Sequence, residues 1–162
     1  MAKSIKYTNN TYLDSTGVVH DKTLLSEVLN NINLDISNIE NMKLLANPDG
    51  WVMNGSQSVN LSENITNQTN GIILVWSAYS NGQAQNWWWN FNVIPKYWVN
   101  HNGGGNGVTC PMFGGSFSSP CAKYVYISNN KISGHNDNSQ SGTANGITYN
   151  NGAYVLRYVL GF

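Results

Sequence analysis

Between Lys22 and Asn47 the apolar residues recur with the period of a helix. Five of them follow one another at spacings of 4, 3, 4 and 3, which is the a/d pattern of a coiled coil. These five are Leu25, Leu29, Ile32, Ile36 and Ile39. Thr23 suits the N-cap, and Pro48 marks the end. The pattern predicts a short helical stalk over residues 22–47.

Isoleucine at both a and d positions favours three strands over two, so we expect a trimeric coiled coil with those five residues at its interface. Only about two to three heptads are present, which is marginal for a coiled coil by itself. Val28, Leu34, Leu44 and Leu45 widen the apolar face. A single helix docked on the rest of the chain is therefore the alternative.

Beyond Gly50 the pattern changes to short apolar runs separated by turn residues. The longest runs are 72–79, 87–94 and 154–160, and the hairpin-favouring dipeptide Asn-Gly occurs seven times in the chain. Such spacing predicts one antiparallel, jelly-roll-like β-sandwich head over residues 48–162. Residues 1–21 alternate around Asn9 and Thr16, which predicts one or two short strands in an N-terminal segment.

Charged residues make up 10% of the chain, against about 25% in an ordinary globular protein. Their place is taken by polar uncharged residues, and about one residue in six is asparagine. The net charge is zero and no basic run is present, so we expect no nucleic-acid binding. The apolar run 72–76 is far shorter than a membrane span needs, and residues 1–6 lack the apolar core of a signal peptide. We expect synthesis in a cytoplasm and no membrane insertion.

Cys110 and Cys121 bracket a segment that begins Cys-Pro and ends Pro-Cys. A chain folded in a reducing cytoplasm favours two buried thiols, and a disulfide formed after release is the alternative. Without a neighbouring pair of histidines, two cysteines do not make a zinc site.

Carboxylates are scarce from Gly50 onward, where Glu63 and Asp137 are the only acidic residues. A glycosidase needs two carboxylates that face one cleft. His101 and His135 are not accompanied by a Gly-x-Ser-x-Gly nucleophile elbow, and His135 with Asp137 supplies at most two metal ligands. We therefore expect no enzymatic activity, no cofactor and no metal.

Eight aromatic residues fall between positions 76 and 98. In a strand, Trp87 and Trp89 would point to one face and Trp88 to the other, so that one face would belong to the core. Tryptophan packs well against a sugar ring and is common at interfaces. A purely structural role, in the core and in a subunit interface, is the alternative.

Two polar loops, 101–107 and 136–145, carry amides and hydroxyls that could match a neutral glycan, although such loops are commonly only solvated connections. Together with the tryptophans they supply the candidate ligand-binding residues. These are Trp87, Trp89, Trp98, His101, Asn102, His135, Asn136 and Asp137.

Two stretches resemble bacteriophage fibre and receptor-binding proteins. Residues 9–25, NNTYLDSTGVVHDKTLL, are similar to N-terminal segments of virion fibre proteins, and residues 126–162, from YISNNKISGHNDN to YVLRYVLGF, resemble the C-terminal ends of receptor-binding domains. The resemblance implies a homotrimer that attaches to other virion proteins through residues 1–21 and displays a β-sandwich head. We accordingly expect a virion protein that binds a host-surface glycan. A purely structural virion component is the alternative, and a cellular lectin or adhesin comes third.

Overall fold

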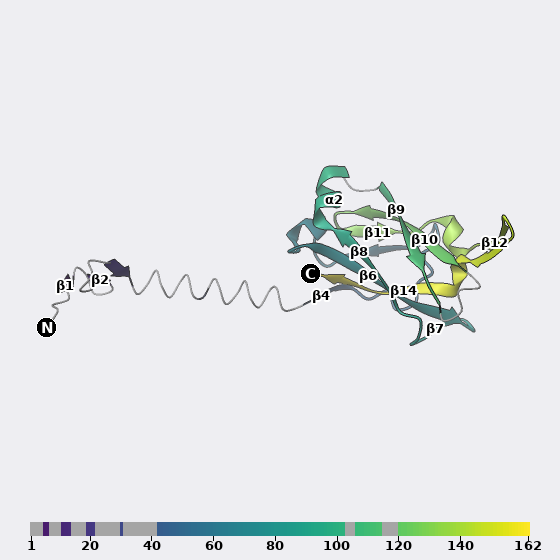
Figure 1. The fold of residues 1–162 in the computed structure, drawn as a ribbon, viewed down its shortest axis with the longest axis horizontal. Helices are drawn as coiled ribbons and strands as arrows, with labels where there is room; N and C mark the ends of the chain where they lie inside the picture. Colours follow the sequence, from purple (N-terminus) through teal and green to yellow (C-terminus); the bar gives the residue numbers. More distant parts are fainter. Residues whose placement is uncertain are drawn as a thin grey trace. The chain divides into compact units, whose positions relative to one another are not determined.

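The computed structural model describes residues 42–102, 106–114 and 120–162, together with Asn30 and three short strands before residue 42. The chain divides into two compact units, Met1–Asn41 and Met42–Phe162. Figure 1 draws both units, and each is described by itself.

The first unit contains an antiparallel three-stranded sheet in the order β1-β2-β3. The strands are β1 (Ile5–Lys6), β2 (Thr11–Leu13) and β3 (Val19–Asp21). Asn30 is helical. The five residues of the predicted coiled-coil interface, Leu25, Leu29, Ile32, Ile36 and Ile39, lie outside the described residues, so the stalk stays a prediction.

The second unit is mainly β, as the sequence predicted. One antiparallel sheet has the order β4-β14-β6-β7, and β8 also pairs with β6. Its strands are β4 (Lys43–Ala46), β6 (Gly71–Ser80), β7 (Gln83–Ala84), β8 (Asn90–Pro95) and β14 (Tyr154–Gly161). We call it the first sheet.

The second sheet has the order β5-β11-β10-β9 and is also antiparallel. Its strands are β5 (Ser58–Asn60), β9 (Asn106–Met112), β10 (Cys121–Ser128) and β11 (Lys131–Ser133). A separate hairpin joins β12 (Ser141–Ala144) to β13 (Ile147–Asn150). The described helices are α2 (Lys96–Asn102) and the 3-10 turns η1 (Ile65–Asn67), η2 (Asn136–Ser139) and η3 (Asn151–Ala153).

The two sheets share one core, because alternate residues of their strands point toward each other. The first sheet contributes Ile72, Leu74, Trp76, Leu156 and Val159, all of them buried. The second sheet contributes Val59, Cys110, Met112, Val125, Ile127 and Ile132. Strands β9, β10 and β11 are consecutive neighbours in one sheet, so the connectivity lacks the alternation between sheets of a jelly roll.

Four local predictions were wrong. The expected polar loop 136–145 forms η2 and strand β12 over most of its length. Lys43–Ala46, expected to end the helix, is strand β4 and pairs with β14, because Leu45 enters the core from this edge. Helix α2 follows Pro95 in a region expected to contain only strands and loops. Much of the expected glycine-rich loop 101–107 belongs to regular elements, since His101 lies in α2 and β9 begins at Asn106.

The pairing of β14 defines two ends of the second unit. At one end Gly161 pairs with both Lys43 and Ile72, and we call this end the base because the chain reaches the unit there. At the other end Tyr154 pairs with Ala78, and we call this the distal end. In Figure 1 the base lies beside the label C, and the distal end carries β7 and the β12–β13 hairpin.

Candidate ligand-binding site at the distal end

The three consecutive tryptophans form a bend that precedes β8 rather than part of a strand. Trp88 has a φ of +56°, a left-handed conformation that interrupts any alternation of faces. The exposed fractions of Trp87, Trp88 and Trp89 are 48%, 44% and 38%. The expectation that one face of this segment enters the core is therefore wrong, and Trp76 is the tryptophan at the centre of the core.

Arg157 holds the residues that lead into this bend. A bulge between Leu156 and Tyr158 places it out of register with β6. Its guanidinium Nη1 donates to the carbonyl oxygen of Gln85 and to Oδ1 of Asn86, both at 3.2 Å. The same buried side chain also bonds Asp49 and Ser77 of neighbouring segments.

Trp89 lies over this anchor. Its ring stacks on Tyr158 with centroids 6.5 Å apart and planes 11° apart. The Arg157 guanidinium lies 5.3 Å from the Trp89 ring centre, a cation–π distance. Trp89 is thus fixed on the protein surface, with 38% of its area left exposed.

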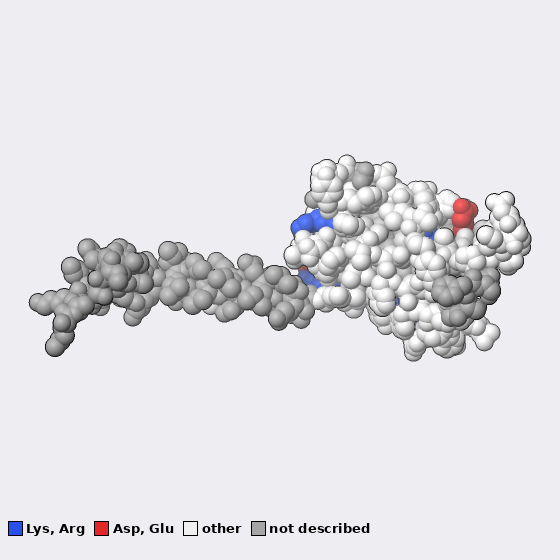
Figure 2. Space-filling view, in the orientation of Figure 1, with Lys and Arg blue, Asp and Glu red and all other residues white. Residues whose placement is uncertain are grey.

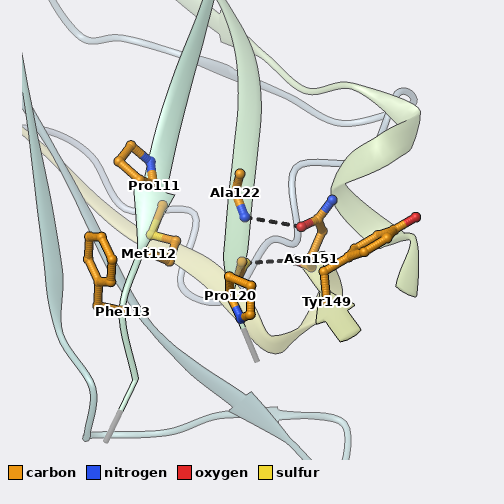
Figure 3. Close-up of a pocket in the computed structure, with 8 residues that line it drawn as sticks. Pro111, Met112, Phe113, Pro120, Ala122, Tyr149 and Asn151 are labelled. Carbon is orange, nitrogen blue, oxygen red and sulfur yellow. Dashed lines mark hydrogen bonds between the residues drawn. The ribbon is translucent and has the colours of Figure 1, made fainter. Parts of the chain in front are cut away.

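A pocket of about 400 Å³ opens beside the bend, at the ends of β9 and β10 (Figure 3). This volume falls within the usual range of small-ligand sites. The lining contains no charged side chain. It consists of Pro111, Met112, Phe113, Pro120, Cys121, Ala122, Tyr149 and Asn151.

Asn151 gives the pocket a fixed polar wall. Its Oδ1 accepts a hydrogen bond from the Ala122 amide at 3.0 Å, and its Nδ2 donates to the carbonyl oxygen of Asp137 at 3.0 Å. Figure 3 shows this side chain between β10 and Tyr149. The amide orientation is therefore set by the fold before any ligand arrives.

Asn90 joins the tryptophan bend to the opposite wall. Its Oδ1 accepts from the Phe113 amide at 2.9 Å, and its Nδ2 donates to the carbonyl oxygens of Phe113 and Trp88 at 3.1 and 2.9 Å. A Cβ added to Gly114 would meet Trp88 Cε3 at 3.1 Å, so the indole packs directly on the chain that leaves the pocket. The contacts of Asn90 and Trp88 thus connect the exposed tryptophans directly to the wall of the pocket.

Both cysteines are buried and free, as the sequence favoured. Cys121 is opposite Met112, and Cys110 is opposite Lys123, so the two thiols are diagonal neighbours in the ladder. Diagonal Cα atoms lie about 7–8 Å apart, beyond the roughly 4.4–6.8 Å of a disulfide. Burial raises the pKa of Cys110 to about 12 and that of Cys121 to about 11, which keeps both thiols protonated and weakly nucleophilic at neutral pH.

Lys123 is fully buried behind the pocket wall. Its Nζ donates to the carbonyl oxygens of Val52 at 3.0 Å and Asn138 at 2.9 Å. Burial lowers its pKa from 10.5 to about 8, a change that the neighbouring Cys121 partly opposes. The ammonium thus faces carbonyl groups, and it forms no ion pair with a carboxylate of the described residues.

The predicted site residues fall into two groups at opposite ends. At the distal end, His135, Asn136 and Asp137 begin η2, next to the pocket through the bond between Asn151 and the Asp137 carbonyl. The His135 ring contacts Tyr124 and Tyr126 edge-on or tilted.

At the base, helix α2 carries Trp98, His101 and Asn102. Trp98 packs partly buried against the core, and His101 stacks on Tyr97 with ring centres 3.6 Å apart. The side chain of Asn102 lies outside the described residues. Sequence reasoning therefore assigned to one site two groups of residues that lie at opposite ends of β8 in the fold.

Sequence reasoning missed Phe113, Tyr149 and Asn151. Phe113 follows β9, whereas Tyr149 and Asn151 lie close together in β13 and η3, and these two stretches meet only in the folded chain. The one available signal was the proline-flanked Cys-Pro…Pro-Cys segment, which sequence reasoning considered only for a disulfide or a zinc site and which supplies most of the pocket wall.

Within the described ranges no three or more His, Cys, Asp or Glu side chains are grouped so that they could hold a metal ion. The described helices are all too short or too polar to cross a membrane. No protein-family model, curated protein or solved structure matches this chain.

Proposed function

We propose that this chain is a non-catalytic virion protein that attaches to a host surface by binding a neutral glycan at the distal pocket. One observation carries the proposal: an uncharged pocket with aromatic rims lies at the end of the unit opposite to the base. A ligand-binding tip at that end is free to meet a surface, while the base leads to the preceding chain.

The chemistry of the pocket suits a sugar. Sugar rings present apolar C–H faces that pack on aromatic side chains, and hydroxyls that pair with amides. Phe113 is 61% exposed and lines the pocket, while Asn151 offers a preoriented amide. The missing charge disfavours phosphorylated or strongly acidic ligands and favours neutral ones.

The placement of the carboxylates supports binding rather than hydrolysis. Glu63 pairs with Lys43 at the base, Asp49 pairs with Arg157, and Asp137 lies on the distal surface. A retaining glycosidase needs its two carboxyl groups about 5–5.5 Å apart in one cleft, and an inverting one about 6.5–9.5 Å apart. The described acids do not gather at the pocket.

The virion assignment rests on the resemblance of residues 9–25 and 126–162 to phage fibre proteins. A three-stranded N-terminal unit followed by a β head is consistent with an attachment segment and a receptor-binding domain. A trimer belongs to the same proposal, with the heptad stripe as its stalk.

The test is binding of the purified full chain to a glycan array and to a panel of intact bacterial strains. Phe113→Ala and Tyr149→Ala each remove one aromatic wall, and each should weaken retention roughly 10-fold, as expected for one lost stacking contact. Tyr97→Ala is the matched control, because Tyr97 is 70% exposed but lies in α2 at the base.

Equal losses for all three variants would contradict a distal site. If the wild-type chain is retained by no glycan and no strain, the proposal fails and the purely structural virion role takes its place. Release of reducing ends from host polysaccharide would contradict the non-catalytic part.

A further inference from the structure

The outer face of the first sheet is apolar along two adjacent rows. One row crosses four strands, and the strand register places its members side by side: Leu44, Leu160, Ile73 and Val93. The next row contains Tyr158, Val75 and Phe91. We call these seven residues the apolar face.

The apolar face is exposed mainly along its two edges, with Leu44 51% exposed, Val93 55% and Phe91 63%. Between the edges Val75 is buried and the Tyr158 ring lies against Trp89. Soluble proteins rarely expose contiguous apolar patches of several hundred Å² unless the patch is an interaction site. Toward the distal end the same sheet is covered by the Arg157 network, so the exposure is confined to the half near the base.

The second sheet provides an internal comparison. One row of its outer face is polar and consists of Asn60, Lys131 and Ser128, whereas Tyr124 and Tyr126 lie on the same outer face of β10. An antiparallel sheet with one face in the core normally presents such polar residues to water on the other face. The two rows of the apolar face contain no charged residue, so the first sheet departs further from this rule and is the better candidate to be covered.

We propose that the apolar face is the contact between three copies of this chain, arranged around a common axis. The inference rests on the trimer of the proposed function and deepens it by assigning the interface in the head. The position of β4 in the sequence supports this assignment. Strand β4 carries Leu44 at the edge of the apolar face and directly follows the heptad stripe.

Chain length limits how far β4 can lie from the stalk. Ile39 is five residues before Leu44, and five residues span at most about 18 Å when fully extended. A coiled coil that gathers three copies of Ile39 must therefore hold three copies of Leu44 close to the same axis. The nearest extensive apolar surface on each copy is then the face that begins with this residue.

Charge also favours a copy of the same chain. None of the seven residues is charged, and the adjacent Lys43 is paired with Glu63. Identical faces can thus approach one another without the repulsion of like charges. Figure 2 shows how sparse Lys, Arg, Asp and Glu are on the visible side of the unit.

The test places a charge on the apolar face of the full chain. Val93→Glu alters an exposed position, so the isolated fold should tolerate it, and Asn60→Glu puts the same charge on the outer face of the second sheet as the control. Light scattering across a dilution series should report three subunits for the wild type and for Asn60→Glu. For Val93→Glu the dissociation constant of the trimer should rise roughly 100-fold or more.

Leu44→Glu, at the other edge of the face, repeats the test with an independent substitution, and circular dichroism checks that each variant is folded. A folded Val93→Glu and Leu44→Glu that stay trimeric with unchanged dissociation would overturn the proposal, as would a monomeric wild type. Glycan binding is recorded in parallel, per binding site. Dissociation by Val93→Glu in a chain that binds no glycan supports this interface even though the proposed function fails.

Discussion

The buried Lys123 makes the stability of the second unit depend on pH. Its pKa is about 8 in the folded chain and 10.5 when it is solvated. The unfolded chain therefore binds more protons between these two values, and the free energy of unfolding rises with pH across that window. Lowering a pKa from 10.5 to about 8 corresponds to about 3 kcal/mol at pH values below both.

Between pH 7.5 and 9 about 1 kcal/mol of this penalty should be relieved, because the folded lysine loses its proton while the unfolded one keeps it. The cysteines act in the opposite direction. Their folded pKa values of about 12 and 11 exceed the ordinary 9.0, so the unfolded chain loses their protons first and stability falls as pH rises through 9. A single pH series on the wild type would mix the two effects.

Lys123→Met separates them, since the variant keeps Cys110 and Cys121. Urea unfolding with a reducing agent, followed by circular dichroism at several pH values, gives the free energy of unfolding of both proteins. The difference between wild type and variant should change by about 1 kcal/mol in favour of the wild type from pH 7.5 to 9. A difference that stays constant within about 0.3 kcal/mol would refute a depressed lysine pKa.

Three further substitutions test the packing that supports the site. Asn138→Ala removes a buried amide that makes three hydrogen bonds to backbone groups, so unfolding should become about 3 kcal/mol easier, whereas the exposed Ser139→Ala should change it by less than about 0.5 kcal/mol. Gly71→Ala combines a φ of +151° with a Cβ that collides with the neighbouring backbone, and urea unfolding should show at least twice the loss of Gly82→Ala, whose Cβ meets nothing within 4 Å. Arg157→Met releases the residues that lead into the tryptophan bend, so the near-ultraviolet circular dichroism should weaken and the tryptophan emission should shift to longer wavelength; an unchanged spectrum would contradict the anchoring role.

The turns were the most predictable part of the fold. Asn81 and Gly82 both have positive φ and join β6 to β7, and Asn145 and Gly146 do the same between β12 and β13. Few other dipeptides adopt this conformation at low cost, which is why Asn-Gly predicts hairpins. The dipeptide alone does not place them, because Asn106 and Gly107 begin strand β9 and Asn151 and Gly152 lie in η3. The long apolar runs likewise became β6 and β14, the two central strands of the first sheet.

Other elements depend on distant partners. Leu44 and Leu45 continue a helical spacing, yet they form a strand because β14 offers its edge to them. The tryptophan bend has the composition of a strand, and its shape depends on Trp88 at positive φ and on Arg157 from far along the chain. The pocket is even harder to predict from the sequence, because its walls come from β9, β10 and β13 and exist only after those strands have met.

The position of β14 between β4 and β6 has a consequence for synthesis. Because Gly161 pairs with both Lys43 and Ile72, the first sheet lacks the strand that joins β4 to β6 until residue 161 has left the ribosome. Until then β4 has no partner in its sheet, and the apolar sides of β4 and β6 are exposed together. The pairing of β4 with β14 joins residues from nearly opposite ends of the sequence of this unit. Such long-range pairing is typical of slow folding. We therefore expect the nascent chain to need protection from aggregation during translation, and a ribosome-bound chain halted before β14 should be cut by protease within β6.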